Sequence, residues 1–446
     1  MNRKKGIHFY INIVNLDDVV EKEEEHTGEV RHAIHALDTF FSSIEAYGKR
    51  HYPKAFVIEK ITGSRLHMYI ESENIPFAFE IVSAVSRYAY NLTAFLSDQI
   101  GKYKTLLPFQ LQVGACFGSF YEFEFERENA NELTTIGFAA NFAAKLQGLA
   151  RPMHICMSQN IFDDLTPVQK TAFIRIQTTA IQKYDQDCYY DALLRDLEVN
   201  FHLQEDLEYA RQIAARVNLG EMQFRDATQQ ISYRALSKKE GKKLMGIPLF
   251  ADIRGFTAQF DSEDANLVEM AAKTQNILTA MYNVVEKQHG THVQFQGDRE
   301  LAVFHDHSSY RCTADAVIAG LRIIDNVKIY QVCVGVGQAY GKLFAAKIGA
   351  RCEKDNILLG RSVVEADRNE DEFADKNQLV ISPDVYQRLQ VENSDLAAMF
   401  QKRNGYYFTT SGFGYQSFLT EQSKKQLVTE NRRNNYNGAW GTCSCK

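Results

Sequence analysis

The chain has 446 residues, of which 45% are hydrophobic and 24% are charged. This length and composition are typical of a soluble globular protein with two or three domains. The formal net charge of −6 argues against a nucleic-acid-binding protein, because such proteins usually carry an excess of basic residues. No long uninterrupted apolar run is present, and the apolar N-terminal segment is broken at His8 and Asn12. We therefore expect a cytoplasmic protein with no signal peptide and no membrane insertion.

The eight cysteines are dispersed and form no CxxC pair, so a zinc site is not expected. Their reduced state would fit a cytosolic compartment. Cys443 and Cys445 lie in a polar C-terminal stretch and could bind a metal or take part in redox chemistry. A pair of exposed reduced thiols explains them more simply.

The first half of the chain alternates strand patterns and amphipathic helix patterns. Around Gly63, two alternating apolar runs predict a hairpin. In chain order we predict a strand at 8–16, a helix at 31–51, the hairpin at 55–72, a helix at 77–100, a pair of strands at 109–126, a loop and helix at 134–150, and a strand at 154–158.

The second half repeats this order. Its hairpin turns at Gly297, and a glycine at 290 ends the helix that precedes it. We predict a strand at 246–254, a helix at 264–290, the hairpin at 292–306, a helix at 314–327, a strand at 330–341, a loop and helix at 356–368, and a strand at 379–382.

Two copies of one α/β unit explain the repeated order most economically. We place the first domain at residues 1–195 and the second at 244–422. Residues 196–243 are charged and predict a helical connector, although they could equally extend the last helix of either domain. Residues 423–446 are polar and predict a loosely ordered tail.

Asp252 and Asp298 are candidate metal ligands in the second copy. Asp252 ends a strand before a glycine turn, and Asp298 follows Gly297 at a hairpin tip. Carboxylates on the ends of adjacent strands can converge on Mg²⁺, which prefers a few carboxylates together with substrate phosphates. Two such ions suit an in-line displacement at phosphorus. Ordinary turn chemistry would explain either aspartate alone.

The first copy lacks both carboxylates, since Asn12 stands where the second copy has Asp252 and Ser64 where it has Asp298. It carries cationic and amide side chains instead. These are Lys60, Asn141 and Lys145, against Gln294, Val364 and Arg368 in the second copy. Asn141 and Lys145 are four residues apart and share one helix face. The two copies are therefore complementary, with metal ligands in one and hydrogen-bond donors in the other.

Two motifs of the second copy, PLFADIRGFT and FQGDRELAVF, resemble the metal-binding half of class III nucleotide cyclases. The motifs EKITGS and TTIGFAANFAAKLQGLA of the first copy resemble the substrate-binding half. The resemblance implies an α+β fold with a ferredoxin-like βαββαβ core in each half. It also implies that the two tandem cyclase-homology domains form an intramolecular pseudo-twofold pair with active sites at their interface.

Residue roles follow from the same resemblance. Asp252 and Asp298, with the backbone carbonyl of Ile253, would hold two Mg²⁺ or Mn²⁺ ions. Asn141 would orient the ribose, and Lys145 stands where the family usually has an arginine that stabilises the transition state, although a lysine lacks the planar fork. The remaining roles are phosphate binding by Arg351 and base reading by Lys60 and Thr134.

The implied reaction is attack of a ribose 3′-oxygen on the α-phosphorus, which gives a 3′,5′-cyclic nucleotide and pyrophosphate. The second interface site has no metal ligands, so we expect one active site per chain. A divergent tandem pair resembles the pyrimidine cyclases of bacterial Pycsar anti-phage systems. That likeness favours CTP as substrate and a separately encoded effector that binds the cyclic nucleotide. An adenylate cyclase, or an inactive cyclase-like nucleotide sensor, are the alternatives.

Overall fold

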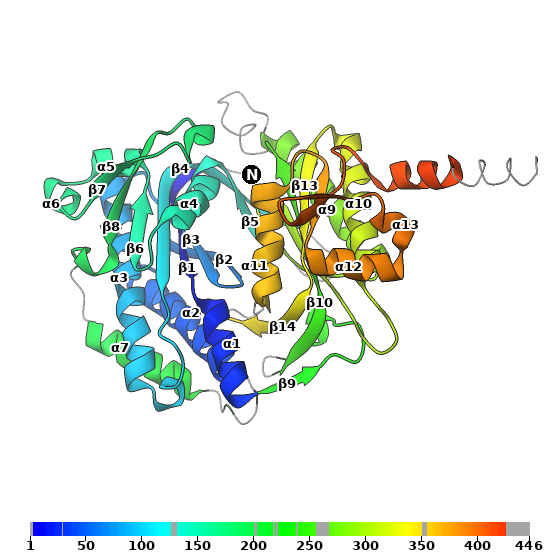
Figure 1. Cartoon of the computed structure of the whole chain (residues 1–446). Helices are drawn as coiled ribbons and strands as arrows, with labels where there is room; N and C mark the ends of the chain where they lie inside the picture. The colour runs from blue at the N-terminus through cyan, green and yellow to red at the C-terminus, as the bar shows by residue number, and fades with distance from the viewer. Residues whose placement is uncertain are drawn as a thin grey trace, which may run out of the picture.

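The computed structural model describes residues 3–28, 30–125, 132–199, 203–216, 219, 222–237, 240–255, 267–349 and 355–424. The described chain contains two mixed α+β domains with one large sheet each (Figure 1). Within these residues, none of the helices has the length and hydrophobicity of a membrane-spanning segment.

The first domain is built on a sheet of order β2-β3-β1-β4-β6-β8-β7, with β5 paired to β4. Its strands are β1 (Arg3–Ile13), β2 (Phe56–Thr62), β3 (Arg65–Glu71), β4 (Leu111–Phe125), β5 (Glu132–Ile136), β6 (His154–Met157), β7 (Ile174–Gln177) and β8 (Cys188–Leu193). Its α-helices are α1 (Leu16–Thr27), α2 (Arg31–His51), α3 (Ile75–Gln99), α4 (Phe138–Leu149), α5 (Gln159–Asp164) and α6 (Pro167–Lys170).

The second domain has the sheet order β11-β12-β10-β13-β16-β18-β17, with β14 paired to β10 and β15, and β9 paired to β10. Its strands are β10 (Glu240–Arg254), β11 (Thr291–Gln296), β12 (Arg299–His305), β13 (Cys333–Gln338), β14 (Gly341–Ile348), β15 (Asp355–Leu359), β16 (Gln378–Ile381), β17 (Gln401–Arg403) and β18 (Tyr406–Phe408). Its α-helices are α9 (Leu267–Lys287), α10 (Thr313–Val327), α11 (Arg361–Arg368), α12 (Pro383–Glu392) and α13 (Ser394–Ala397).

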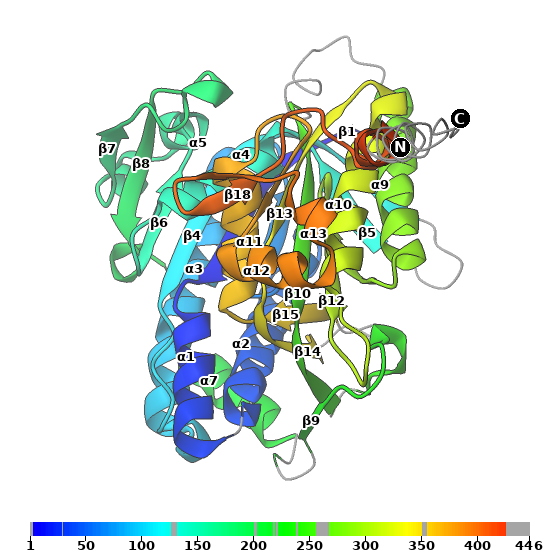
Figure 2. The same ribbon diagram turned by 45° about the vertical axis from the view of Figure 1, so that its right-hand side comes forward.

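In each domain a pair of long helices covers one face of the sheet. Helices α2 and α3 pack together on the first sheet, and α9 and α10 pack together on the second (Figure 2). Strand β1 alternates accordingly: Ile7, Phe9 and Ile11 enter the core beneath the helices. The intervening His8 and Tyr10 belong to the opposite face, because neighbouring strand residues point to opposite sides. On that opposite face of the first sheet lies α4, whose apolar residues form a separate core cluster against which Tyr10 packs.

Strand pairing confirms that the halves are equivalent. Asn12 of β1 pairs with Arg65 of β3, just as Asp252 of β10 pairs with Arg299 of β12. Both hairpins carry a register shift at the same place, between Ile58 and Lys60 in one and between His292 and Gln294 in the other. The chain is thus a tandem pair of equivalent α+β domains, as the sequence predicts.

The two domains exchange apolar residues across their interface. Ile136 at the end of β5 is buried in the core of the second domain. Reciprocally, Ile357 and Leu359 of β15 are buried in the core of the first domain. Backbone amides add to the contact, since Ile61 N donates to Asp355 Oδ2 at 3.1 Å. Each half therefore completes the core of the other.

Several predicted elements differ in detail. Residues 109–126 predict a strand pair, but β4 is one long strand, because its partner β5 comes from the segment predicted as a loop. Likewise β15 occupies part of the loop predicted before α11. Helix α1 and the hairpin β7–β8 were not predicted. Short amphipathic segments such as these gain their stability mainly from tertiary packing, which a sequence pattern does not reveal.

The predicted helical connector at 196–243 is only partly helical. It contains α7 (Leu203–Ala215), but also the short strand β9 (Gln223–Asp226) and the start of β10 at Glu240, before the expected domain boundary at 244. The last described residues, 415–424, form a helix that projects from the second domain (Figure 1). Most of the predicted tail at 423–446, with Cys443 and Cys445, lies outside the described residues.

Candidate active site

Asp252 and Asp298 lie at one end of the second sheet. Asp252 is near the end of the central strand β10, and Asp298 is at the turn between β11 and β12. Gly297 forms this turn with a φ of 68°, a left-handed conformation that glycine adopts without strain. Strands β10 and β12 are neighbours, so the fold brings both carboxyl groups to the same edge.

The environment of both aspartates disfavours their negative charge. Burial, followed by repulsion from Asp298, raises the pKa of Asp252 to about 8. Burial likewise raises the pKa of Asp298, to about 7. A divalent cation would reverse this unfavourable situation, because an opposite charge close to a carboxylate favours its ionised form. The site is therefore better suited to carboxylates with bound cations than to carboxylates alone.

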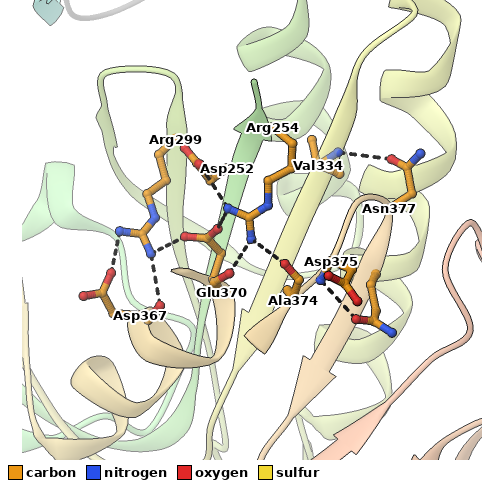
Figure 3. Close-up of polar contacts among 10 residues, drawn as sticks. Asp252, Arg254, Arg299, Val334, Asp367, Glu370, Ala374, Asp375 and Asn377 are labelled. Carbon is orange, nitrogen blue, oxygen red and sulfur yellow. Dashed lines mark hydrogen bonds and ion pairs between the residues drawn. The ribbon is translucent and has the colours of Figure 1, made fainter. Parts of the chain in front are cut away.

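Two arginines, one of them beside Asp252, share a buried glutamate (Figure 3). Arg254 Nη1 is 3.4 Å from Asp252 Oδ2 and 2.6 Å from Glu370 Oε1. Arg299 Nη2 is 2.5 Å from Glu370 Oε2, and its Nη1 is 2.5 Å from Asp367 Oδ1. Glu370 thus joins the two arginines that follow the two aspartates in the sequence. These charged neighbours were not predicted from the sequence.

Lys60 and Thr134 meet at the interface between the domains. Lys60 Nζ donates to the backbone carbonyl of Phe295 in the second domain at 2.9 Å and to Thr134 Oγ1 at 3.4 Å. Lys60 is 4% exposed, and Thr134 is fully buried. The β-bulge before Lys60 shifts the register of β2, which allows consecutive residues Glu59 and Lys60 both to reach β5. Two residues assigned to base reading by family resemblance are therefore in contact.

A chain of buried polar side chains lies directly behind Lys60. Glu59 Oε1 accepts from Thr135 N at 3.0 Å, and Glu59 Oε2 lies 2.9 Å from His67 Nδ1. His67 Nε2 is in turn 3.0 Å from His8 Nδ1. Burial opposes ionisation of Glu59, but the charge and hydrogen bond of His67 outweigh it and lower the pKa of Glu59 to about 2.

The ligand atoms of His8, Glu59 and His67 lie close enough together to suggest a metal site. However, His67 uses one ring nitrogen toward His8 and the other toward Glu59. A single ion could not collect all three groups without breaking this chain. Burial also lowers the pKa of His8, to about 3, so the imidazole is neutral at physiological pH. We interpret the cluster as a hydrogen-bond chain that fixes the hairpin carrying Lys60.

Asn141 and Lys145 lie on α4, which begins directly after Gly137. Both side chains are partly buried. Gly137 leaves no room for a side chain, since a Cβ atom there would lie 2.7 Å from the Ser119 carbonyl oxygen. The lack of a side chain at Gly137 thus lets the start of α4 lie close to β4. This contact fixes the positions of Asn141 and Lys145 relative to that strand. Arg351, predicted to bind phosphate, lies outside the described residues.

Two tyrosines of the first domain approach the carboxylates of the second. Burial and the charges of Asp371, Asp252 and Asp298 raise the pKa of Tyr184. Tyr10 stacks on His67 with ring centroids 4.1 Å apart, and burial followed by Glu59 raises its pKa, to which Asp298 contributes. No motif points to these tyrosines, because the domain interface brings them to the site.

The equivalent position in the first domain holds neutral side chains. Ser64 Oγ donates to Asn12 Oδ1 at 2.7 Å, and Asn12 Nδ2 donates to Gln112 Oε1 at 3.4 Å. Helix α1 follows Asn12, and its acidic Glu21 lies 2.5 Å from Arg361 of α11. The residues that correspond to Asp252 and Asp298 are therefore an amide and a hydroxyl, which hydrogen-bond to each other.

Two similar α+β domains in one chain place Asp252 and Asp298 at one end of the second sheet, and Lys60 of the first domain reaches the second domain at the Phe295 carbonyl. Residues 240–415 match the family of adenylate and guanylate cyclase catalytic domains. The second half of the chain is therefore similar to the catalytic domains of this family.

The whole fold is similar to that of a class III adenylyl cyclase-like ATP-binding protein from Pseudomonas aeruginosa. The TM-score is 0.74, with 16% sequence identity over 94% of this chain and 90% of that chain. At this identity, the similarity establishes the fold, with two cyclase-like domains in one chain.

Curated relatives match a smaller part. An uncharacterised protein of Mycobacterium tuberculosis is 29% identical over 139 residues, which cover 30% of this chain and 25% of that protein. An uncharacterised protein of Mycobacterium bovis is 28% identical over 123 residues, covering 27% and 23% of the two chains. The matched segment thus covers about a quarter of the length of each of these relatives.

Proposed function

We propose that the chain is a class III nucleotide cyclase with one active site, which converts CTP to 3′,5′-cyclic CMP and pyrophosphate. The observation that carries this proposal is the complementarity across the interface. Asp252 and Asp298 of the second domain would be the metal ligands, and the first domain would contribute Asn141, Lys145 and Lys60, which already reaches the second domain at the Phe295 carbonyl. The first domain has Asn12 and Ser64 at the corresponding positions, which accounts for a single site.

The residues present fit a site for two hard divalent cations. The candidate donors are the carboxylates of Asp252 and Asp298 and the backbone carbonyl of Ile253, and oxygen donors are what Mg²⁺ and Mn²⁺ prefer. When bound, such ions would polarise the phosphates and stabilise the charge that develops on the attacking and leaving oxygens. The raised pKa values of both aspartates agree with a site that is balanced only by added positive charge.

The roles of the protein's own groups are positioning and charge stabilisation. Asn141 would hold the ribose so that its 3′-oxygen faces the α-phosphorus. Lys145 would stabilise the charge on that phosphate in the transition state. Lys60 and Thr134 would hydrogen-bond to the base edge, and Arg351 would bind the terminal phosphates.

A small base is favoured by the way Lys60 is enclosed. Its ammonium group already contacts Thr134 and the Phe295 carbonyl, and Phe295 is 2% exposed. A pyrimidine requires less displacement of these buried groups than a purine does. Lysine donates hydrogen bonds and accepts none, so it suits the O2 and N3 acceptors of cytosine. The cyclic nucleotide would act through a separately encoded effector, as in the anti-phage systems that the sequence resembles.

The test is turnover of each of the four ribonucleoside triphosphates by the purified full-length chain with Mn²⁺, with products separated by chromatography. We expect cyclic CMP as the main product, less cyclic UMP, and little product from ATP or GTP. An Asp298→Asn variant is the control for metal-dependent turnover. Robust conversion of ATP with CTP inert would contradict the base assignment and leave adenylate cyclase as the activity.

A nucleotide sensor without turnover is the second candidate. Two observations favour it: Lys145 replaces the usual arginine, and the similar protein from Pseudomonas aeruginosa is described as adenylyl cyclase-like and ATP-binding. Calorimetry with each nucleoside triphosphate would distinguish the two functions. Tight binding without any cyclic product, with either Mg²⁺ or Mn²⁺, would support the sensor and overturn the cyclase.

A further inference from the structure

Glu370 is a buried carboxylate that contacts both arginines beside the proposed metal ligands. It is 1% exposed, and its two oxygens lie 2.6 Å from Arg254 Nη1 and 2.5 Å from Arg299 Nη2 (Figure 3). The same Nη1 atom of Arg254 is also 3.4 Å from Asp252 Oδ2. One guanidinium nitrogen therefore faces two carboxylates, and it lies closer to Glu370.

The surrounding backbone leaves space for this arrangement. A Cβ atom at Gly335 would lie 1.9 Å from Arg254 Nη2, and one at Gly337 would lie 2.4 Å from Glu370 N. Both glycines belong to β13. Glu370 itself lies in a π-helical turn, Asn369–Phe373, that follows α11, and such turns are frequent at functional sites. Arg254 also donates to the Ala374 carbonyl at 3.0 Å, which fixes its Nη2 atom away from Asp252.

The first copy provides an internal comparison. A Cβ at Gly114 would lie 2.1 Å from Gln147 N, just as a Cβ at Gly337 would approach Glu370 N. Gln147 is therefore the counterpart of Glu370, as Asn12 is the counterpart of Asp252. The copy without metal ligands carries an amide at both positions. Gln147 Nε2 donates to Gln112 Oε1, which also accepts from Asn12. A carboxyl group at position 370 thus accompanies a carboxyl group at position 252.

We propose that Glu370 is a positioning residue that draws the Arg254 guanidinium toward itself, so that Arg254 makes only a long hydrogen bond of 3.4 Å to Asp252 and leaves Asp252 available to a divalent cation. Without Glu370, the nearest carboxylate to Arg254 Nη1 is that of Asp252, only 3.4 Å away. An arginine paired with Asp252 would compete directly with the cation, because both require the same carboxylate oxygens. The inference rests on the proposed metal-dependent function.

The test is Mn²⁺ binding to the full-length protein, measured from the free-Mn²⁺ signal in electron paramagnetic resonance, with Mn²⁺ alone as the probe. Glu370→Gln keeps the shape of the side chain and removes its charge. We expect the Mn²⁺ dissociation constant to rise by about 10- to 100-fold, the usual effect of losing a group that orients a metal ligand. The Mn²⁺ concentration for half-maximal turnover should rise in parallel.

Three further variants separate positioning from other roles. Glu365→Gln is the matched control, since Glu365 is on α11, just before the turn that carries Glu370, but lies near Arg368 and Asp384 instead of Arg254. It should bind Mn²⁺ like the wild type. Glu370→Asp keeps the charge but shortens the reach, so it should bind weakly, like Glu370→Gln. In the double variant Glu370→Gln with Arg254→Gln the competing cation is gone, and Mn²⁺ affinity should be restored.

The proposal is overturned if folded Glu370→Gln binds Mn²⁺ like the wild type, or if the double variant binds no better than Glu370→Gln. Wild-type Mn²⁺ affinity in Glu370→Asp would also overturn it, because a carboxylate at this position would then support Mn²⁺ binding without reaching Arg254. An Asp252→Asn variant keeps the two hypotheses distinguishable. If Asp252→Asn binds Mn²⁺ as well as the wild type does, the metal site itself is wrongly assigned, and the proposed function fails before the role of Glu370 is reached.

Discussion

Lys60 Nζ of the first domain lies 2.9 Å from the backbone carbonyl oxygen of Phe295 in the second domain. The two residues occupy hairpins of opposite copies, and Phe295 is three residues before the candidate metal ligand Asp298. A side chain expected to read the base thus donates a hydrogen bond to the strand that leads to the candidate metal site.

Replacing Lys60 tests its expected contact with the base. We expect Lys60→Ala to lower kcat/KM for CTP by about 10- to 100-fold, the effect of losing a hydrogen bond to a charged donor and leaving its partners unsatisfied. The CTP-to-UTP ratio should move toward one, while the Mn²⁺ dependence stays similar. Initial rates with both nucleotides are the measurement. An unchanged ratio would show that Lys60 does not contact the base.

Replacing a candidate metal ligand should lower the activity but raise the stability of the metal-free protein. Asp298→Asn should reduce turnover by more than about a hundredfold, because a lost ligand removes several kcal/mol of charge stabilisation. Burial raises the pKa of Asp298 to about 7, so its contribution to stability is present at acidic pH and lost as the pH rises through that value. Without metal at pH 8, the variant should therefore melt a few degrees higher than the wild type.

The same experiment has an internal control. Added Mn²⁺ should raise the melting temperature of the wild type by mass action and leave that of Asp298→Asn nearly unchanged. Scanning calorimetry with and without Mn²⁺ measures both effects. Equal stabilisation of the two proteins by Mn²⁺ would contradict the assignment of Asp298 as a ligand.

Catalysis should require both halves of the chain. Asn141→Ala or Lys145→Ala in the first domain should lower kcat by about 10²- to 10³-fold, the effect of removing one group that stabilises developing charge. Mn²⁺ binding at Asp252 and Asp298 should be preserved. Lys145→Arg, which restores the usual family residue, should retain activity. Full activity of both alanine variants would exclude the first domain from the site.

Introducing carboxylates into the first copy should not create a second active site. In Asn12→Asp with Ser64→Asp, the adjacent Gln112 and Gln147 remain amides, and Glu21 still pairs with Arg361. The rate per chain should stay that of the wild type. A rate that doubles, or that survives addition of Asp252→Ala to the same chain, would show that the second site can be activated.

His8 should make the protein sensitive to acid. Its pKa is lowered to about 3 from a usual 6.5, mainly by burial, so the unfolded state binds a proton that the folded state rejects. Stability is then lost as the pH falls below about 6.5, by at most about 1.4 kcal/mol per pH unit. His8→Phe fits among the rings of Tyr69 and Phe120 and cannot be protonated. Its melting temperature should fall less than that of the wild type between pH 7 and pH 5.

The sequence by itself determined the tandem architecture and the metal-ligand candidates. Helix and strand periodicities are local, and the repeated order of elements identified two copies without any contact information. Asp252 and Asp298 were recognisable because a strand end and a glycine turn are marked by neighbouring residues. The same alignment of the two copies places Gln147 of the first opposite Glu370 of the second. The sequence therefore also contains this amide–carboxylate difference.

Only the tertiary structure decided which side chains surround those ligands. The contact of Lys60 with Phe295 spans 235 residues, and that of Arg254 with Glu370 spans 116, so no local pattern encodes either. The same holds for Ile136, whose burial in the opposite domain depends on how the two sheets face each other. Periodicity specifies the face on which a residue lies. The partner on that face is specified by packing between segments that are distant in sequence, because apolar burial and charge pairing act through space rather than along the chain.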